Sequence, residues 1–290
     1  MPWLDWAWAP FTEFGFMQRA LLGCVVLSLG AAPIGVFLML RRMSLTGDAM
    51  AHAVLPGAAI GYLVSGLSLA AMTLGGIVAG LMVAVASGLV ARSTVQREDA
   101  SLAAFYLVSL ALGVLIVSVR GNSVDLLHVL FGTALSLSPE ALWLIAGIGL
   151  ASVVGLALLF RPLVAECLDP EFLRSVSRWS PVAHYGFLVL VVINLVAGFH
   201  ALGTLMAVAI MILPAASARF WARRIQPLLG LAVLAAVLAC WSGLLLSYYV
   251  DWPTSPAIVL VLGAWYALSL FLGRFGLVRQ NRLSPVHLKG

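Results

Sequence analysis

The sequence predicts an all-α polytopic membrane protein with about nine transmembrane helices. Of its 290 residues, 63% are hydrophobic and only 9% are charged, whereas a soluble domain carries about 25% charged residues. A soluble core of this length cannot enclose so much apolar surface, so lipid must cover a large part of it. The net charge of +5 is spread between apolar runs and forms no basic patch, which argues against a nucleic-acid partner.

Apolar runs long enough to cross a bilayer, about 20 residues each, follow one another along the chain and predict a single transmembrane domain over residues 1–290. Eight or ten spans remain possible, and the sixth and seventh runs are short enough to form a broken pair. The nine expected spans are 16–40, 48–66, 69–91, 100–119, 140–160, 182–199, 202–218, 228–249 and 256–273.

The positions of the basic residues predict the orientation of these spans. With the N-terminus outside and nine alternating spans, every Lys and Arg except Arg19 and Arg120 falls on the inner side. Basic residues are enriched in cytoplasmic loops, so we expect an outer N-terminus and a cytoplasmic C-terminus. The segment 121–139, which contains His128, is then expected outside.

The single lysine of the chain, Lys289, lies next to the C-terminus. A phosphate-binding P-loop requires a lysine after a glycine-rich turn in a soluble α/β domain. We therefore expect this chain not to be an enzyme that hydrolyses ATP by that route. Any coupling to ATP requires a separate partner subunit.

Two polar residues lie at the start of the second apolar run, where polar side chains are energetically expensive. Asp48 and His52 are four residues apart, so on a helix they share one face, and one cation could bridge them. A charge inside a membrane costs at least about 2.5–3.5 kcal/mol and usually faces a transport pathway or a partner. The alternatives are an N-cap role for Asp48 and a satisfied interior position for His52.

Pro56 follows one turn after His52 and is expected to kink the helix, as is Pro214 in the segment 203–219. A proline frees backbone carbonyls that can line a polar cavity within the membrane. Imidazole suits zinc, and carboxylate oxygen suits manganese. One Asp and one His cannot complete a metal shell, so a second copy of the chain or other spans must supply further ligands.

The other histidines are weaker candidates for metal binding. His200, at the outer turn between the sixth and seventh spans, and His128 are further candidate ligands, with an ordinary surface histidine as the alternative for each. His184 and His287 are expected to be solvated on the inner side.

The longest polar stretch on the inner side, about 169–178, predicts a short amphipathic helix. Asp169 suits an N-cap and Pro170 the first helical position, while Phe172 and Leu173 lie on an apolar face and Arg174 lies elsewhere. Such a helix either rests on the membrane surface or docks an ATPase, and the residues alone leave both open.

These motifs together resemble the permease subunits of bacterial zinc and manganese ABC importers. The resemblance rests on segments in the same order along nearly the whole chain, namely 41–57, 125–132, 169–172 and 203–219. It implies a homodimer of permeases in the bacterial plasma (inner) membrane, two ATP-binding-cassette ATPase subunits and an extracytoplasmic solute-binding protein. It also implies Zn²⁺ or Mn²⁺ as transported cargo, with no permanently bound cofactor.

The resemblance further implies that Asp48 and His52 line the metal route and that the coupling helix maps onto Asp169–Ser177, including Glu171. Leu173 and Ser177 depart from the small residue and the glycine usual in that helix. Two other functions remain open: an importer of the same architecture for a metal chelate, of siderophore or cobalamin-like type, and a secondary transporter driven by an ion gradient.

Overall fold

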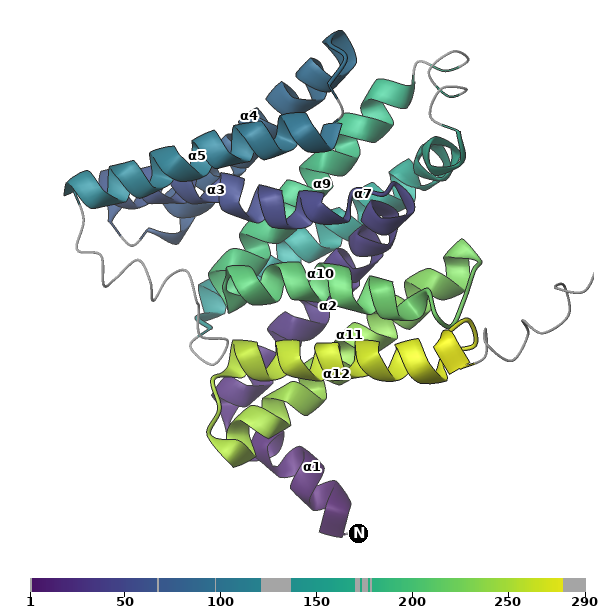
Figure 1. The fold of residues 1–290 in the computed structure, drawn as a ribbon. Helices are drawn as coiled ribbons and strands as arrows, with labels where there is room; N and C mark the ends of the chain where they lie inside the picture. Colours follow the sequence, from purple (N-terminus) through teal and green to yellow (C-terminus); the bar gives the residue numbers. More distant parts are fainter. Residues whose placement is uncertain are drawn as a thin grey trace, which may run out of the picture.

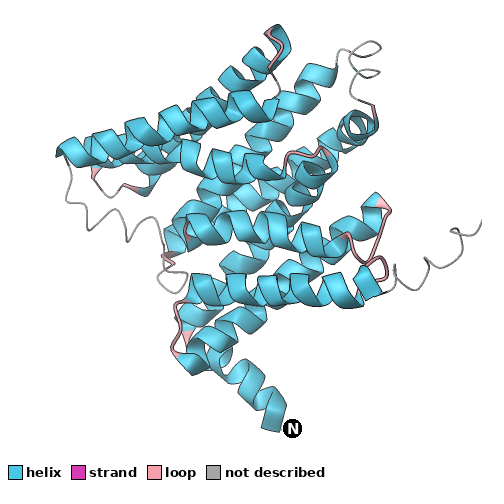
Figure 2. Ribbon diagram, viewed as in Figure 1, coloured by secondary structure: helices cyan, strands magenta, loops and turns pink. Residues whose placement is uncertain are grey.

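The computed structural model describes residues 2–66, 68–96, 98–120, 137–169, 173, 177 and 179–278. Within these residues it contains helices and no strand (Figure 2), which confirms the all-helical prediction. The helices are α1 (Pro2–Glu13), α2 (Gly15–Leu40), α3 (Ser44–Ser65), α4 (Leu69–Ser93), α5 (Glu98–Arg120), α7 (Pro139–Leu168), α9 (Trp179–Leu202), α10 (Thr204–Ala218), α11 (Ile225–Val250) and α12 (Thr254–Leu272).

Each of the nine predicted spans coincides with one helix, and 7 helices in the described residues are long and apolar enough to cross a membrane. The two helices among the predicted spans that do not meet both criteria are α3 and α10. Helix α3 has 22 residues but carries Asp48 and His52, and α10 has only 15 residues. At about 1.5 Å per residue, α10 is roughly 22 Å long, shorter than the hydrocarbon core of about 30 Å.

The helices gather into two groups around a central set (Figure 1). α3, α4 and α5 pack against one another on one side, and α11 packs with α12 on the other. Between them, α2 contacts α7, α10 and α11, and α9 contacts α7 and α4. In the centre, the ring of Phe37 in α2 meets Phe160 of α7 at 6.0 Å and Phe187 of α9 at 6.4 Å, both edge-to-face, a favourable aromatic geometry.

Glycines set the positions of α3 and α10 by allowing backbones to touch. A Cβ at Gly57 of α3 would overlap the carbonyl of Gly75 in α4, and a Cβ at Gly75 would overlap the carbonyl of Gly57. In the same way, a Cβ at Gly35 of α2 would overlap the carbonyl of Met211 in α10. Membrane helices commonly pack through such small residues because lipid provides no hydrophobic force between them.

We expect Gly75→Ala to lower the melting temperature of the purified protein, because the added methyl group must push α3 away from α4. Overpacking of this kind typically costs about 1–3 kcal/mol. The matched control is Gly147→Ala in α7, where a Cβ meets nothing within 4 Å and alanine favours the helix by about 0.5–1 kcal/mol. Thermal unfolding in detergent measures both, and equal melting temperatures would contradict the close contact.

Candidate functional site

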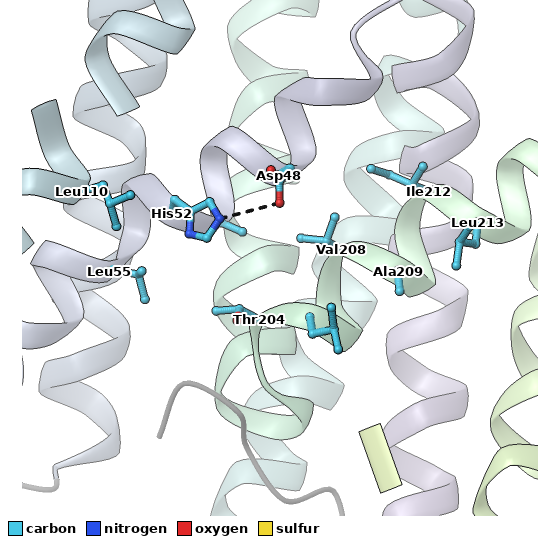
Figure 3. Close-up of a pocket in the computed structure, with 11 residues that line it drawn as sticks. Asp48, His52, Leu55, Leu110, Thr204, Val208, Ala209, Ile212 and Leu213 are labelled. Atoms are coloured by element: carbon cyan, nitrogen blue, oxygen red, sulfur yellow. Dashed lines mark ion pairs between the residues drawn. The ribbon is translucent and has the colours of Figure 1, made fainter. Parts of the chain in front are cut away.

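Asp48 and His52 lie on one face of α3, as their spacing predicts (Figure 3). His52 Nε2 is 3.8 Å from Asp48 Oδ1, which is too long for a hydrogen bond. The His52 side chain is 38% exposed and the Asp48 side chain is 62% exposed. The pair is therefore oriented toward a common space without being closed by a direct bond.

The start of α3 excludes the alternative role for Asp48. Helix α3 begins at Ser44, with Met43 at the N-cap and no side-chain capping bond. Asp48 lies a full turn inside the helix, so its carboxylate does not cap it, and it remains available to other partners.

A cavity of about 560 Å³ lies in front of the pair, between α3 and α10. Its lining is apolar except for Asp48, His52 and Thr204; the other lining residues are Ala51, Leu55, Leu110, Leu205, Val208, Ala209, Ile212 and Leu213 (Figure 3). The Asp48 carboxylate attracts a cation and repels an anion, and solvent partly screens this attraction because its side chain is 62% exposed. The cavity is thus suited to a small cation rather than to an anion.

His52 has unused bonding capacity on two atoms. Its Nδ1 is buried and has no hydrogen-bond partner within the described part of the chain. Its carbonyl also loses the usual helical bond, because Pro56, four residues later in α3, has no N–H to donate. The sequence predicted a helix kink at Pro56; the structure places this proline inside α3, and the carbonyl that it leaves without its usual partner belongs to a residue that lines the cavity.

Helix α5 holds the His52 ring and the backbone beside it. The ring of Tyr106 stacks on His52 with centroids 6.4 Å apart and 28° between the planes. One turn further along α5, the Ser109 hydroxyl donates to the Ala53 carbonyl at 3.1 Å. Sequence reasoning missed Tyr106, since nothing in its spacing indicates which helix it faces.

The opposite wall of the cavity depends on the break between α9 and α10. Gly203 there has φ +85, a conformation that side chains disfavour, and it lets α10 start immediately with Thr204. The short sixth and seventh runs allowed for a broken pair here, but the sequence did not identify Thr204 as a lining residue. Pro214 lies inside α10, as predicted.

The remaining predicted positions are described only in part. In the inner segment, the Leu173 amide donates to the Asp169 carbonyl at 3.2 Å and the Ser177 amide to the Leu173 carbonyl at 3.0 Å, the spacing of helical turns. The candidates Pro170, Glu171, Phe172, Arg174 and His128, and the side chain of His200, lie outside the described residues.

The expectation for His184 was wrong. Its side chain is only 3% exposed and lies beside Arg41 and Glu166 instead of in solvent. Among the described residues, no group of three or more His, Cys, Asp and Glu side chains could enclose a metal ion. The Asp48–His52 pair therefore offers two ligand side chains per chain and not a complete shell.

Comparison with known proteins gives the family. Residues 13–273 match the model of the ABC 3 transport family. The manganese transport system membrane protein MntC of Halalkalibacterium halodurans is 33% identical over 260 residues, 89% of this chain and 88% of that protein. The chelated iron transport system membrane protein YfeD of Yersinia pestis is 30% identical, over 96% of this chain and 92% of that protein.

A solved structure has the same fold. PsaBC from Streptococcus pneumoniae in complex with Fab aligns with a TM-score of 0.83 and 28% identity, and the alignment covers 96% of this chain and 99% of that chain. From the matched family model and these relatives, the chain belongs to the ABC 3 transport family and is a multi-pass membrane subunit of an ATP-binding-cassette transporter, in which a separate subunit hydrolyses ATP.

Proposed function

We propose that this permease carries a divalent transition metal, manganese or zinc, into the cytoplasm along a route lined by Asp48 and His52. The observation that carries the proposal is a carboxylate and an imidazole one helical turn apart, 3.8 Å from each other, facing one cavity. Carboxylate and imidazole are ligands for both metals. The manganese relative named above favours manganese as the cargo.

The incomplete ligand set supports a homodimer. One chain presents two ligand side chains, whereas zinc takes four ligands and manganese commonly six. A second copy facing the cavity adds another Asp48–His52 pair, and water can complete the shell. In such a homodimer each chain contributes residues 1–290 as one transmembrane domain.

The distribution of basic residues supports an orientation of the spans across the membrane. We infer nine spans with the N-terminus outside, which places both the turn between α2 and α3 and the segment 169–178 on the cytoplasmic side. Two ATPase subunits then dock against segment 169–178, with Glu171 and Phe172 in the contact. A solute-binding protein delivers the metal on the opposite face.

An iron chelate is the second candidate cargo, because YfeD is named as part of a chelated iron transport system. A chelate arrives with its metal already coordinated, so it has no use for Asp48 and His52 as ligands. The apolar lining with one carboxylate and one imidazole favours a bare cation. A gradient-driven secondary transporter would work without ATPase subunits, which does not agree with the family.

We expect Asp48→Asn and His52→Ala each to reduce ATP-dependent ⁵⁴Mn²⁺ or ⁶⁵Zn²⁺ uptake by tenfold or more. Removing a group that only hydrogen-bonds to a metal ligand already lowers metal affinity or activity about 10–100-fold, so removing a ligand itself should cost at least as much. The assay uses proteoliposomes containing the permease with its ATPase and the solute-binding protein. Glu140→Gln, at an exposed carboxylate in the first turn of α7, is the control and should transport normally. Normal uptake by both site variants would remove Asp48 and His52 as ligands.

We also expect opposite labelling of two loop positions in a variant with Cys24, Cys167 and Cys240 replaced. Trp252→Cys, after α11, should react with a membrane-impermeant maleimide on intact cells. Thr94→Cys, at the end of α4, should react only after permeabilisation. Trp252 and Thr94 are both exposed, so access depends on the side of the membrane. Labelling of Thr94→Cys in intact cells would contradict the inferred orientation.

A further inference from the structure

A buried cluster of three ionisable side chains joins the ends of α2, α7 and α9. Arg41 Nη2 lies 3.2 Å from Glu166 Oε1 and 2.6 Å from His184 Nδ1. The side chains of Arg41 and Glu166 are 7% and 3% exposed. The Arg41 guanidinium also lies over the Phe187 ring, with Cζ 5.1 Å from its centroid, a cation–π contact.

The chemistry of the cluster determines the state of the histidine. A guanidinium only donates hydrogen bonds, so His184 Nδ1 accepts from Arg41, and the ring proton of a neutral His184 is on Nε2. Within the described residues, Arg41 Nη1 and Glu166 Oε2 have no hydrogen-bond partner. Arg41 therefore holds both other members, and the cluster is not fully satisfied internally.

Stability alone is a weak reason for such a cluster. Removing paired charges from water costs several kcal/mol per ion, and well-packed apolar residues of similar size often stabilise a protein equally or better. The position of the three residues suggests another role. Glu166 lies three residues before Asp169, and His184 lies seven residues after Ser177, so the two flank the proposed docking segment.

On the other side of the cluster, Arg41 lies at the end of α2, in the short turn that leads to α3. The Arg42 amide donates to the Met39 carbonyl at 3.1 Å, and the Met43 amide donates to the Leu38 carbonyl at 2.8 Å. With Arg42 at φ +60, this is the Schellman arrangement that closes a helix end. Helix α3 starts at Ser44, directly after Met43. The hydrogen-bonded turn 41–43 therefore joins Arg41 to the helix that carries Asp48 and His52 without a flexible loop.

We propose that the Arg41–Glu166–His184 cluster is the mechanical link that passes movement of the ATPase-docking segment to α3 and thus to the Asp48–His52 pair. The inference rests on the proposed function. These three are positioning residues, since none lines the cavity. On the docking side, α7 ends at Leu168, and the extended Asp169 closes it by donating its amide to the Ala165 carbonyl at 3.1 Å, so the segment is joined to α7 three residues after Glu166.

The test measures Mn²⁺ transported per ATP hydrolysed in proteoliposomes containing the permease, its ATPase and the solute-binding protein. Glu166→Gln keeps the shape of the side chain and removes its charge. We expect ATP hydrolysis to continue while the transport ratio falls about fivefold or more, the lower end of coupling between distant sites. Equilibrium Mn²⁺ binding by the permease should stay unchanged, because Asp48 and His52 are intact.

Three further variants separate a link from a merely structural contact. Arg41→Lys replaces the forked guanidinium with a single ammonium group and should lower the same ratio of Mn²⁺ transported per ATP. If Glu166→Gln does not assemble, Arg41→Lys provides the test of the link. The exchange Arg41→Glu with Glu166→Arg should restore part of the lost ratio. Arg161→Gln, at an exposed position of α7, should behave as wild type.

Two results would overturn the link. One is an unchanged transport ratio in Glu166→Gln and Arg41→Lys. The other is a parallel fall of transport and hydrolysis that matches the amount of assembled complex, since that is what a structural defect produces. If wild-type protein moved no Mn²⁺ or Zn²⁺, the proposed function would fail and the link with it. Normal wild-type transport that is sensitive to Asp48→Asn but not to Glu166→Gln removes the link alone.

Discussion

A carboxylate and an imidazole in a membrane helix must face something other than lipid, and this constraint accounts for the surroundings of α3. Asp48 and His52 point into a cavity whose far wall is α10. Gly57 is nine residues after Asp48, about half a turn round the helix, and contacts α4 backbone to backbone. One face of α3 is thus pressed against its neighbour while the polar face remains open.

The fold was predictable where it depends on local composition. All nine apolar runs coincide with helices, because a stretch of about 20 apolar residues is a property of the sequence itself. The ends were less predictable. The fifth run was expected to stop at residue 160, before Arg161 and Pro162, yet α7 continues to Leu168. A proline removes one backbone bond without necessarily ending a helix in a membrane protein, and Glu166 beyond it finds Arg41 as a buried partner.

The site was predictable to the same extent and for the same reason. The shared face of Asp48 and His52 follows from an i, i+4 spacing on one helix, and the structure shows it. Tyr106 belongs to α5 and Thr204 to α10. That these two residues lie near His52 and its cavity depends on packing between helices, which a single sequence does not reveal. His184 illustrates the same limit, because its place near the inner end of a span indicated solvent, whereas α2 and α7 enclose it with opposite charges.

The rigidity of α3 has a consequence for how a two-chain site could release its cargo. Asp48 and His52 belong to one helix and are one turn apart, so they move together and their mutual distance changes little. In a homodimer, affinity then depends on the distance between the two pairs. Separating the pairs removes half of the protein ligands at once, whereas a shift within one pair would require α3 to unwind. Under the proposed link, a movement delivered at the first turn of α3, beside Arg41, would change that separation, and each 1.4 kcal/mol of lost binding energy weakens metal binding about tenfold.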